Sequence, residues 1–219
     1  MYRYIFFDLD GTLTDSKEGV LGSVCYALEK MGAPIPSEET LLKFMGPPLQ
    51  SSYMEHCGFT AEQALEAEKI FQERYVPIGI YENEPAEGCV EFLARLKEKG
   101  YVLALASSKP ETMCHKVCDH FGFTPYLDVI SGSPLLGNKV TKGDVIRQAM
   151  AALHLTEADV PAILMVGDRK YDVLGAAESG IACVGLELFG YAEEGEMEQA
   201  GAIAVVRDLA ELETFIETH

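Results

Sequence analysis

The fold is decided by the stretch Tyr4-Ile5-Phe6-Phe7-Asp8-Leu9-Asp10-Gly11-Thr12, in which a short apolar run ends in two acids. An apolar run of this length is typical of a strand that is buried on both faces. Two carboxylates directly after such a strand are costly to bury unless a cation or a proton joins them. In an extended segment Asp8 and Asp10 point the same way, and Gly11 lets the chain fold back and offer amides to a phosphate. The alternative interpretation is an ordinary polar junction between a strand and a turn.

Similar short apolar runs recur along the chain and alternate with amphipathic helical patterns, such as residues 89–99, which are followed by Gly100. Strands covered on both faces and separated by helices predict an α/β fold with a Rossmann-like parallel sheet as its core. The expected strands are residues 4–7, 101–106, 129–131, 162–166, 181–184 and 202–205.

The segment 16–81 differs from the rest because it contains helical patterns and no convincing strand. Ser37 is placed as the N-cap of one of these helices. We therefore expect a core domain of residues 1–15 and 82–219, interrupted by an inserted α-helical cap domain of residues 16–81. The chain leaves the sheet after Thr12, so the insertion is expected over the carboxyl end of the first strand, where open parallel sheets bind ligands. The helical patterns cover residues 18–31, 37–44, 49–57 and 61–78.

Composition excludes several classes of function. The chain has 219 residues, of which 48% are hydrophobic and 24% are charged, as in an ordinary globular protein. A net charge of −18 disfavours a nucleic-acid partner, because such binders need clustered Lys and Arg. The apolar runs are strand-sized and no secretory signal precedes Asp8, so we expect a cytoplasmic protein that does not enter a membrane. The six cysteines show no paired spacing and are expected to remain reduced thiols.

A second group of acids follows the apolar run 162–166, where Gly167-Asp168 is followed four residues later by Asp172. If a helix starts near Arg169, Asp172 lies in its first turn, on the side where a metal could join it to Asp168. Hard oxygen ligands of this kind suit Mg²⁺. The alternative is that Asp168 is an N-cap and that Asp172 is a favourable charge in the first turn.

Hydroxyls and lysines complete the set of candidate residues. Ser107 and Ser108 end the run 101–106, where they could bind phosphate oxygens or merely cap the helix expected near Glu111. Lys142 precedes another helical pattern and could bring positive charge to a phosphoryl group, or it could be a solvated lysine. Because the carboxyl ends of parallel strands meet at one edge of a sheet, we expect these groups to converge there.

The chain resembles the haloacid dehalogenase-like hydrolase superfamily, and more narrowly its phosphoglycolate phosphatase-like branch with a helical cap. Its four motifs are matched in order by residues 6–12, by residues 103–107, by Lys142, and by Gly167-Asp168 with Asp172. Many relatives carry Lys-Pro where this chain has Lys142-Gly143, which leaves Lys139 as a weaker rival for that role. Lys109 is a further basic candidate.

The resemblance implies a phosphatase that uses Mg²⁺. Asp8 would be the nucleophile and a metal ligand, and Asp10 would be the general acid and base. Asp10 would also lend its carbonyl to the metal, which Asp168 would bind directly and Asp172 directly or through water. The catalytic residues that the resemblance implies are Asp8, Asp10, Ser107 and Lys142, and the substrate-binding residues are Leu9, Gly11, Thr12, Ser107, Ser108 and Lys142.

Several functions share this set of residues. Dehalogenases resemble the fold but lack an acid equivalent to Asp10, so hydrolysis of a small phosphorylated metabolite is the favoured function. A phosphomutase, a nucleotidase or a pyrophosphatase would use the same acids. A non-catalytic phosphate-binding module would be expected to have lost one of them, yet Asp8, Asp10, Asp168 and Asp172 are all present. Monomer and homodimer both remain open.

Overall fold

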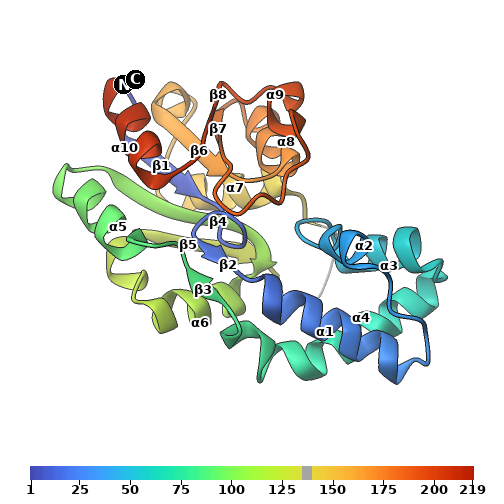
Figure 1. Cartoon of the computed structure of the whole chain (residues 1–219). Coiled ribbons are helices and arrows are strands. Elements are labelled where there is room, and N and C mark those ends of the chain that lie inside the picture. Colours follow the sequence, from blue (N-terminus) through green and yellow to red (C-terminus); the bar gives the residue numbers. More distant parts are fainter. Residues whose placement is uncertain (135–139) are drawn as a thin grey trace. The chain divides into compact units, whose positions relative to one another are not determined.

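The computed structural model describes residues 1–134 and 140–219 (Figure 1). The chain divides into two compact units. Residues 1–14 and 85–219 form an α/β unit, and Asp15–Glu84 form a helical unit. Within the described residues, no helix combines the length and the apolar character needed to cross a membrane.

The α/β unit is built on a parallel sheet that contains, among the described residues, six strands in the order β5-β4-β1-β6-β7-β8. The α/β, Rossmann-like fold class is thereby confirmed. The strands are β1 (Tyr4–Phe7), β4 (Val102–Pro110), β5 (Val129–Ser133), β6 (Ile163–Gly167), β7 (Ala182–Leu186) and β8 (Ala204–Val206). The helices and 3₁₀ turns of this unit are α5 (Cys89–Glu98), α6 (Glu111–Phe121), η2 (Thr124–Tyr126), α7 (Lys142–Ala152), η3 (Val160–Ala162), α8 (Lys170–Glu178), α9 (Glu196–Ala200) and α10 (Leu209–Thr218).

Helices cover both faces of the sheet, which explains why its strands are apolar almost throughout. Alternate residues of a strand face opposite sides. Phe6 and Met165 face one side and are buried in a cluster with residues of α7, α8 and α9. Phe7 faces the other side, where its ring meets that of Phe92 from α5 edge-on at a centroid distance of 6.0 Å. Full burial of each such side chain contributes about 1.5–3 kcal/mol.

Strand β1 occupies the centre of the sheet and determines where the functional groups emerge. Phe7 is in register with Leu105 of β4 on one side and with Val166 of β6 on the other. The chain passes from β1 to β4 and β5, and then crosses β1 to reach β6, β7 and β8. Open α/β sheets bind ligands at such a reversal of strand order, at the carboxyl ends of the strands. Asp8 and Asp168 therefore emerge at this point.

The helical unit contains four α-helices among the described residues, and side chains cap two of them. Ser37 accepts a hydrogen bond from the backbone N of Thr40, as predicted for an N-cap. Thr60 and Gln63 form a capping box at the start of another helix. Tyr75 ends that helix, three residues before the expected end at Ile78. The elements are α1 (Lys17–Lys30), α2 (Glu38–Leu42), α3 (Leu49–Cys57), α4 (Ala61–Tyr75) and the 3₁₀ turn η1 (Gly79–Tyr81).

Two short strands, β2 (Thr14–Asp15) and β3 (Glu84–Pro85), carry the chain out to the helical unit and back. They pair with each other in a separate two-stranded sheet. Their sequences were not predicted as strands, because two residues are too few to show a periodic pattern. The helices α9 and α10 were also absent from the sequence interpretation, and β4 continues through Pro110 where a strand ending at Ala106 was expected.

Candidate active site

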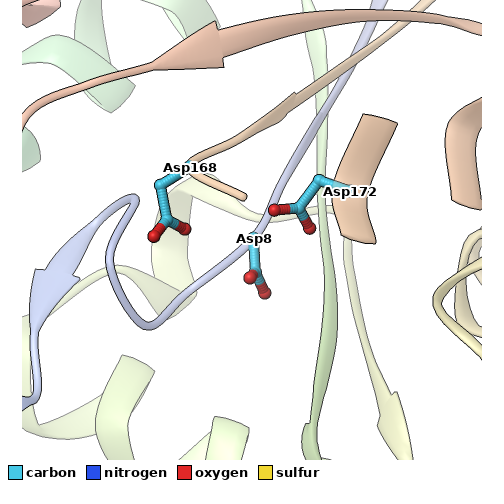
Figure 2. A group of neighbouring side chains, drawn as sticks. All are labelled: Asp8, Asp168 and Asp172. Carbon is cyan, nitrogen blue, oxygen red and sulfur yellow. The ribbon is translucent and has the colours of Figure 1, made fainter. Parts of the chain in front are cut away.

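Three carboxylates converge at the carboxyl edge of the sheet (Figure 2). Asp8 follows β1, Asp168 follows β6, and Asp172 lies in the first turn of α8. Each offers an oxygen atom, and these atoms all lie within 4.8 Å of one another. The backbone N of Asp8 donates to Val166 O at 2.9 Å, so the hydrogen bonding of the sheet continues to the acid itself. The two most distant segments of the predicted metal site are therefore brought together by adjacent strands.

Burial makes this group of acids electrostatically unfavourable unless a cation is close. Asp168 and Asp172 are only 4% and 2% exposed. Burial raises the pKa of Asp168 well above its ordinary value, and the negative charges of Asp172 and Asp8 raise it further. Burial also raises the pKa of Asp172, against the opposing effect of Lys142. Carboxylate oxygens converging in a buried position fit a hard divalent cation such as Mg²⁺.

Lys142 supplies a positive charge to the same group. Its side chain is buried, and Nζ lies 2.8 Å from Asp8 Oδ1 and 2.7 Å from Asp172 Oδ1. Burial disfavours the charged form of Lys142, but the carboxylates of Asp172 and Asp8 together raise its pKa. A cation at the first residue of a helix is also disfavoured by the helix dipole. The two carboxylates thus offset both effects and keep this lysine charged.

The backbone around Lys142 is fixed by a cap and by close packing of helices. Thr141 Oγ1 accepts from the backbone N of Asp144 at 3.1 Å, and Asp144 Oδ2 accepts from the backbone N of Thr141 at 2.9 Å. On the neighbouring helix α8, a Cβ added at Gly175 would lie 2.7 Å from Lys142 Cβ. A side chain at Gly175 would therefore hold α7 and α8 apart. Glycine at this position allows Lys142 to reach Asp172.

The turn after β1 is fitted tightly around Asp168. The Leu9 carbonyl accepts hydrogen bonds from the backbone N of Leu13 at 2.9 Å and of Thr14 at 3.0 Å, while the Leu9 side chain is fully buried. Gly11 has φ +87°, and a Cβ there would lie 2.1 Å from Asp168 Oδ2. Thr12 Oγ1 donates to Asp168 Oδ1 at 3.0 Å. The Thr12 hydroxyl thus orients a predicted metal ligand, a contact that the sequence interpretation did not include.

Asp10 is not part of the group formed by the other three acids. Lys109 Nζ lies 2.9 Å from Asp10 Oδ1 and 2.6 Å from Asp10 Oδ2, so both carboxylate oxygens contact this lysine. Lys109 belongs to β4 and is buried. Ser107 Oγ, also buried, accepts from the backbone N of Lys109 at 3.3 Å, whereas Ser108 is exposed. The rival Lys139 lies outside the described residues.

The geometry agrees with a comparison to known families. The model of the family described as haloacid dehalogenase-like hydrolase matches residues 5–186, which include the ends of β1, β4 and β6 and the first turn of α8. The chain belongs to the haloacid dehalogenase-like hydrolase family. The predicted family and the prediction of an enzyme are thereby confirmed.

Individual haloacid dehalogenase-like relatives carry different names. A 5'-nucleotidase from Pseudomonas aeruginosa is 38% identical over 218 residues, which cover 100% of this chain and 97% of the relative. The tyrosine-protein kinase PtkA from Mycobacterium tuberculosis is 37% identical over 184 residues, which cover 83% of this chain and 61% of the kinase. The crystal structure of a predicted phosphatase from Clostridium acetobutylicum superposes with a TM-score of 0.92 at 38% identity, with 100% of both chains covered.

One further contact in this haloacid dehalogenase-like hydrolase site was not predicted from the sequence. Arg169, directly after Asp168, is paired with Glu196 of α9, with Nε 2.8 Å from Oε1. Nothing in the sequence singled out Glu196, because it is one of many acids in a chain with an excess of negative charge. Charge pairs that link segments distant in sequence leave no periodic signal.

Proposed function

We propose that the protein is a magnesium-dependent phosphatase that hydrolyses a small phosphate monoester through an aspartyl-phosphate on Asp8. The observation that carries this proposal is the convergence of Asp8 with Asp168, Asp172 and Lys142. A carboxylate with a positive charge beside it and two further acids next to it has the groups that phosphoryl transfer requires. The confirmed family, and the phosphatase and nucleotidase names among its relatives, support the same chemistry.

The metal would be held by Asp8, Asp168 and Asp172, together with the backbone carbonyl of Asp10. When bound, Mg²⁺ supplies positive charge that stabilises the negative charge developing on the phosphoryl oxygens. Lys142 contributes in the same direction, because its ammonium already contacts the Asp8 oxygen at 2.8 Å. Ser107 lies at the end of the adjacent strand β4 and would bind a phosphoryl oxygen through its hydroxyl.

The bond changes are shared between two acids. An Asp8 carboxylate oxygen attacks phosphorus, the bond from phosphorus to the ester oxygen breaks, and Asp10 gives that oxygen a proton. Asp10 then takes a proton from water as the water oxygen attacks the same phosphorus, which releases phosphate and restores Asp8. Both Asp10 carboxylate oxygens contact Lys109 Nζ, so at least one of these contacts must break before Asp10 can hydrogen-bond to the ester oxygen or to water.

The substrate is proposed to be a small phosphorylated metabolite, as the sequence indicated. A nucleoside 5'-monophosphate is the second candidate, because the 5'-nucleotidase relative is 38% identical along the whole chain. The helical unit 15–84 is proposed to act as the cap that selects between them. A panel of phosphorylated metabolites that includes nucleoside monophosphates, assayed for released phosphate, separates these substrates.

The proposal is tested by release of inorganic phosphate from an aryl phosphate, with Mg²⁺ and with a chelator. Asp8→Asn keeps the shape of the side chain but removes the nucleophile, so turnover should fall by roughly a thousandfold or more. Asp119→Asn, at an exposed position on α6, is the matched control and should retain turnover. Circular dichroism checks that both variants are folded. Turnover by Asp8→Asn equal to that of the wild type would refute the assignment of the nucleophile.

A further inference from the structure

We propose that Glu196 is a positioning residue that holds residues 168–172 in the shape needed to bind a divalent cation. Glu196 is the first residue of α9 and lies outside the four motifs of the sequence. Its role in catalysis rests on the proposed function, whereas its effect on the backbone of residues 168–172 does not.

The Glu196 carboxylate fixes two groups at once. Its Oε1 accepts from Arg169 Nε at 2.8 Å and from the backbone N of Lys170 at 3.0 Å, and its Oε2 accepts from Arg169 Nη2 at 3.2 Å. The first amides of a helix have no acceptor within that helix. Glu196 therefore supplies the acceptor for the first amide of α8 from a different helix, and it holds the side chain that precedes this amide.

Arg169 transmits this constraint to both acids. It lies directly after Asp168 in the chain, and its backbone N donates to Asp172 Oδ2 at 3.1 Å. The other oxygen of Asp172 is the one that contacts Lys142 at 2.7 Å. A rotation of the Arg169 peptide would break the contact with Asp172 and would shift Asp168. Fixing Arg169 thus fixes the separation of two predicted metal ligands.

Such a constraint is needed because the acids repel one another. Asp8, Asp168 and Asp172 are held within 4.8 Å, and like charges at this distance favour movement apart. A loop that is already fixed loses less freedom when a cation binds, which strengthens binding. Glu196 is well placed to constrain residues 168–172, because its own position is fixed. Its neighbour Met197 is buried and lies 2.6 Å from the position of a Cβ added at Gly185 of β7. The helix that carries Glu196 is therefore closely packed on the sheet.

A purely structural ion pair is the alternative. The side chains of Arg169 and Glu196 are 12% and 5% exposed, so breaking the pair would lower stability in either case. Stability alone therefore does not distinguish the two interpretations. Affinity for Mg²⁺, and the concentration of Mg²⁺ that half-saturates kcat, change only if Glu196 positions the ligands.

The experiment compares Glu196→Ala and Glu196→Gln with Glu198→Ala, an exposed glutamate on the same helix. Mg²⁺ is titrated into each metal-free protein by calorimetry, and kcat and KM for an aryl phosphate are measured over a range of Mg²⁺ concentrations. Amide hydrogen exchange of residues 168–172 is followed in the metal-free proteins. Glu196→Gln keeps an acceptor for Lys170 N, so it should recover part of what Glu196→Ala loses.

We expect Glu196→Ala to weaken Mg²⁺ binding by about tenfold or more and to raise the half-saturating Mg²⁺ concentration, while KM for the phosphate ester stays near that of the wild type. Exchange of the Lys170 amide should become faster, and Glu198→Ala should resemble the wild type. Unchanged Mg²⁺ affinity in Glu196→Ala, or equal losses in Glu198→Ala, would overturn the proposal. A wild type that binds no Mg²⁺ would contradict the proposed function, and it would also overturn the proposal that Glu196 positions the ligands of a cation. Faster exchange in Glu196→Ala would then establish only that Glu196 orders the loop.

Discussion

Replacing Lys142 by methionine should destabilise the metal-free protein and make its stability depend on Mg²⁺. Methionine has nearly the same length as the lysine stem, so the packing of α7 against α8 is largely kept. What is lost is the ammonium that lies within 2.8 Å of both Asp8 and Asp172. Three carboxylates then remain close together without the lysine that offsets them.

The size of the effect follows from the burial of the pair. Removing one partner of a buried ion pair typically costs about 3–5 kcal/mol, because the remaining charge stays buried without compensation. The pKa of Asp168 is already raised by burial, so a proton can replace part of the missing charge. The lower end, about 3 kcal/mol, is therefore the expected loss, which corresponds to roughly 6–12 °C in Tm for a chain of this size.

The assay is thermal unfolding of Lys142→Met and wild type, in a chelator and in excess Mg²⁺. Lys116→Met, at an exposed position on α6, is the control and should match the wild type in both conditions. Mg²⁺ should raise the Tm of Lys142→Met more than that of the wild type, because the cation replaces the missing positive charge. A Lys142→Met protein that melts within about 2 °C of the wild type in chelator would refute this account of the charge balance. Equal shifts with Mg²⁺ would refute it as well.

Three further predictions concern the turn, a helix cap and a surface network. Gly11→Ala places a Cβ 2.1 Å from Asp168 Oδ2 at a φ of +87°, so phosphatase activity and Tm should both fall, and wild-type values of both would contradict the packing argument. Thr141→Ala removes the side-chain acceptor of the α7 capping box and should cost about 1 kcal/mol in urea unfolding, with Thr141→Ser as the rescuing control. Hydrogen bonds from Arg95 hold the pKa of Glu213 below its ordinary 4.5, so this stabilisation is complete above about pH 4.5 and is lost as the pH falls further. The free energy of unfolding in urea should therefore fall less for Glu213→Gln than for the wild type when the pH is lowered from about 6 to about 3.5. Equal decreases in the two proteins would contradict this role of Glu213.

The sheet was predictable because its strands are buried on both faces. Runs such as residues 4–7 and 163–167 are continuous apolar segments of strand length, and helices cover them on each side. The order and register of the strands were not predictable, because both depend on contacts between segments far apart in sequence. The strands β2 and β3 were not predicted for a different reason. A two-residue strand is defined by its pairing and not by its composition.

The convergence of the acids was predictable because short sequence motifs mark all three of them. Asp8, Asp168 and Asp172 were all named from short motifs, and their oxygens converge within 4.8 Å. Contacts between distant segments were not predictable in the same way. The pairing of Asp10 with Lys109 depends on how β4 lies beside β1, and the sequence around either residue does not indicate its partner.

The pairing of β2 with β3 also bears on how this chain can change. Paired strands lie about 4.8 Å apart, so the polypeptide returns to the sheet almost where it left. In the topology of the α/β unit, residues 15–84 are a long insertion whose two ends are held together by the pairing of β2 with β3. Such loops tolerate large differences in length at a small cost in closure entropy. The inserted segment can thus diverge, shorten or be exchanged for another module while the connectivity between β1 and α5 stays the same.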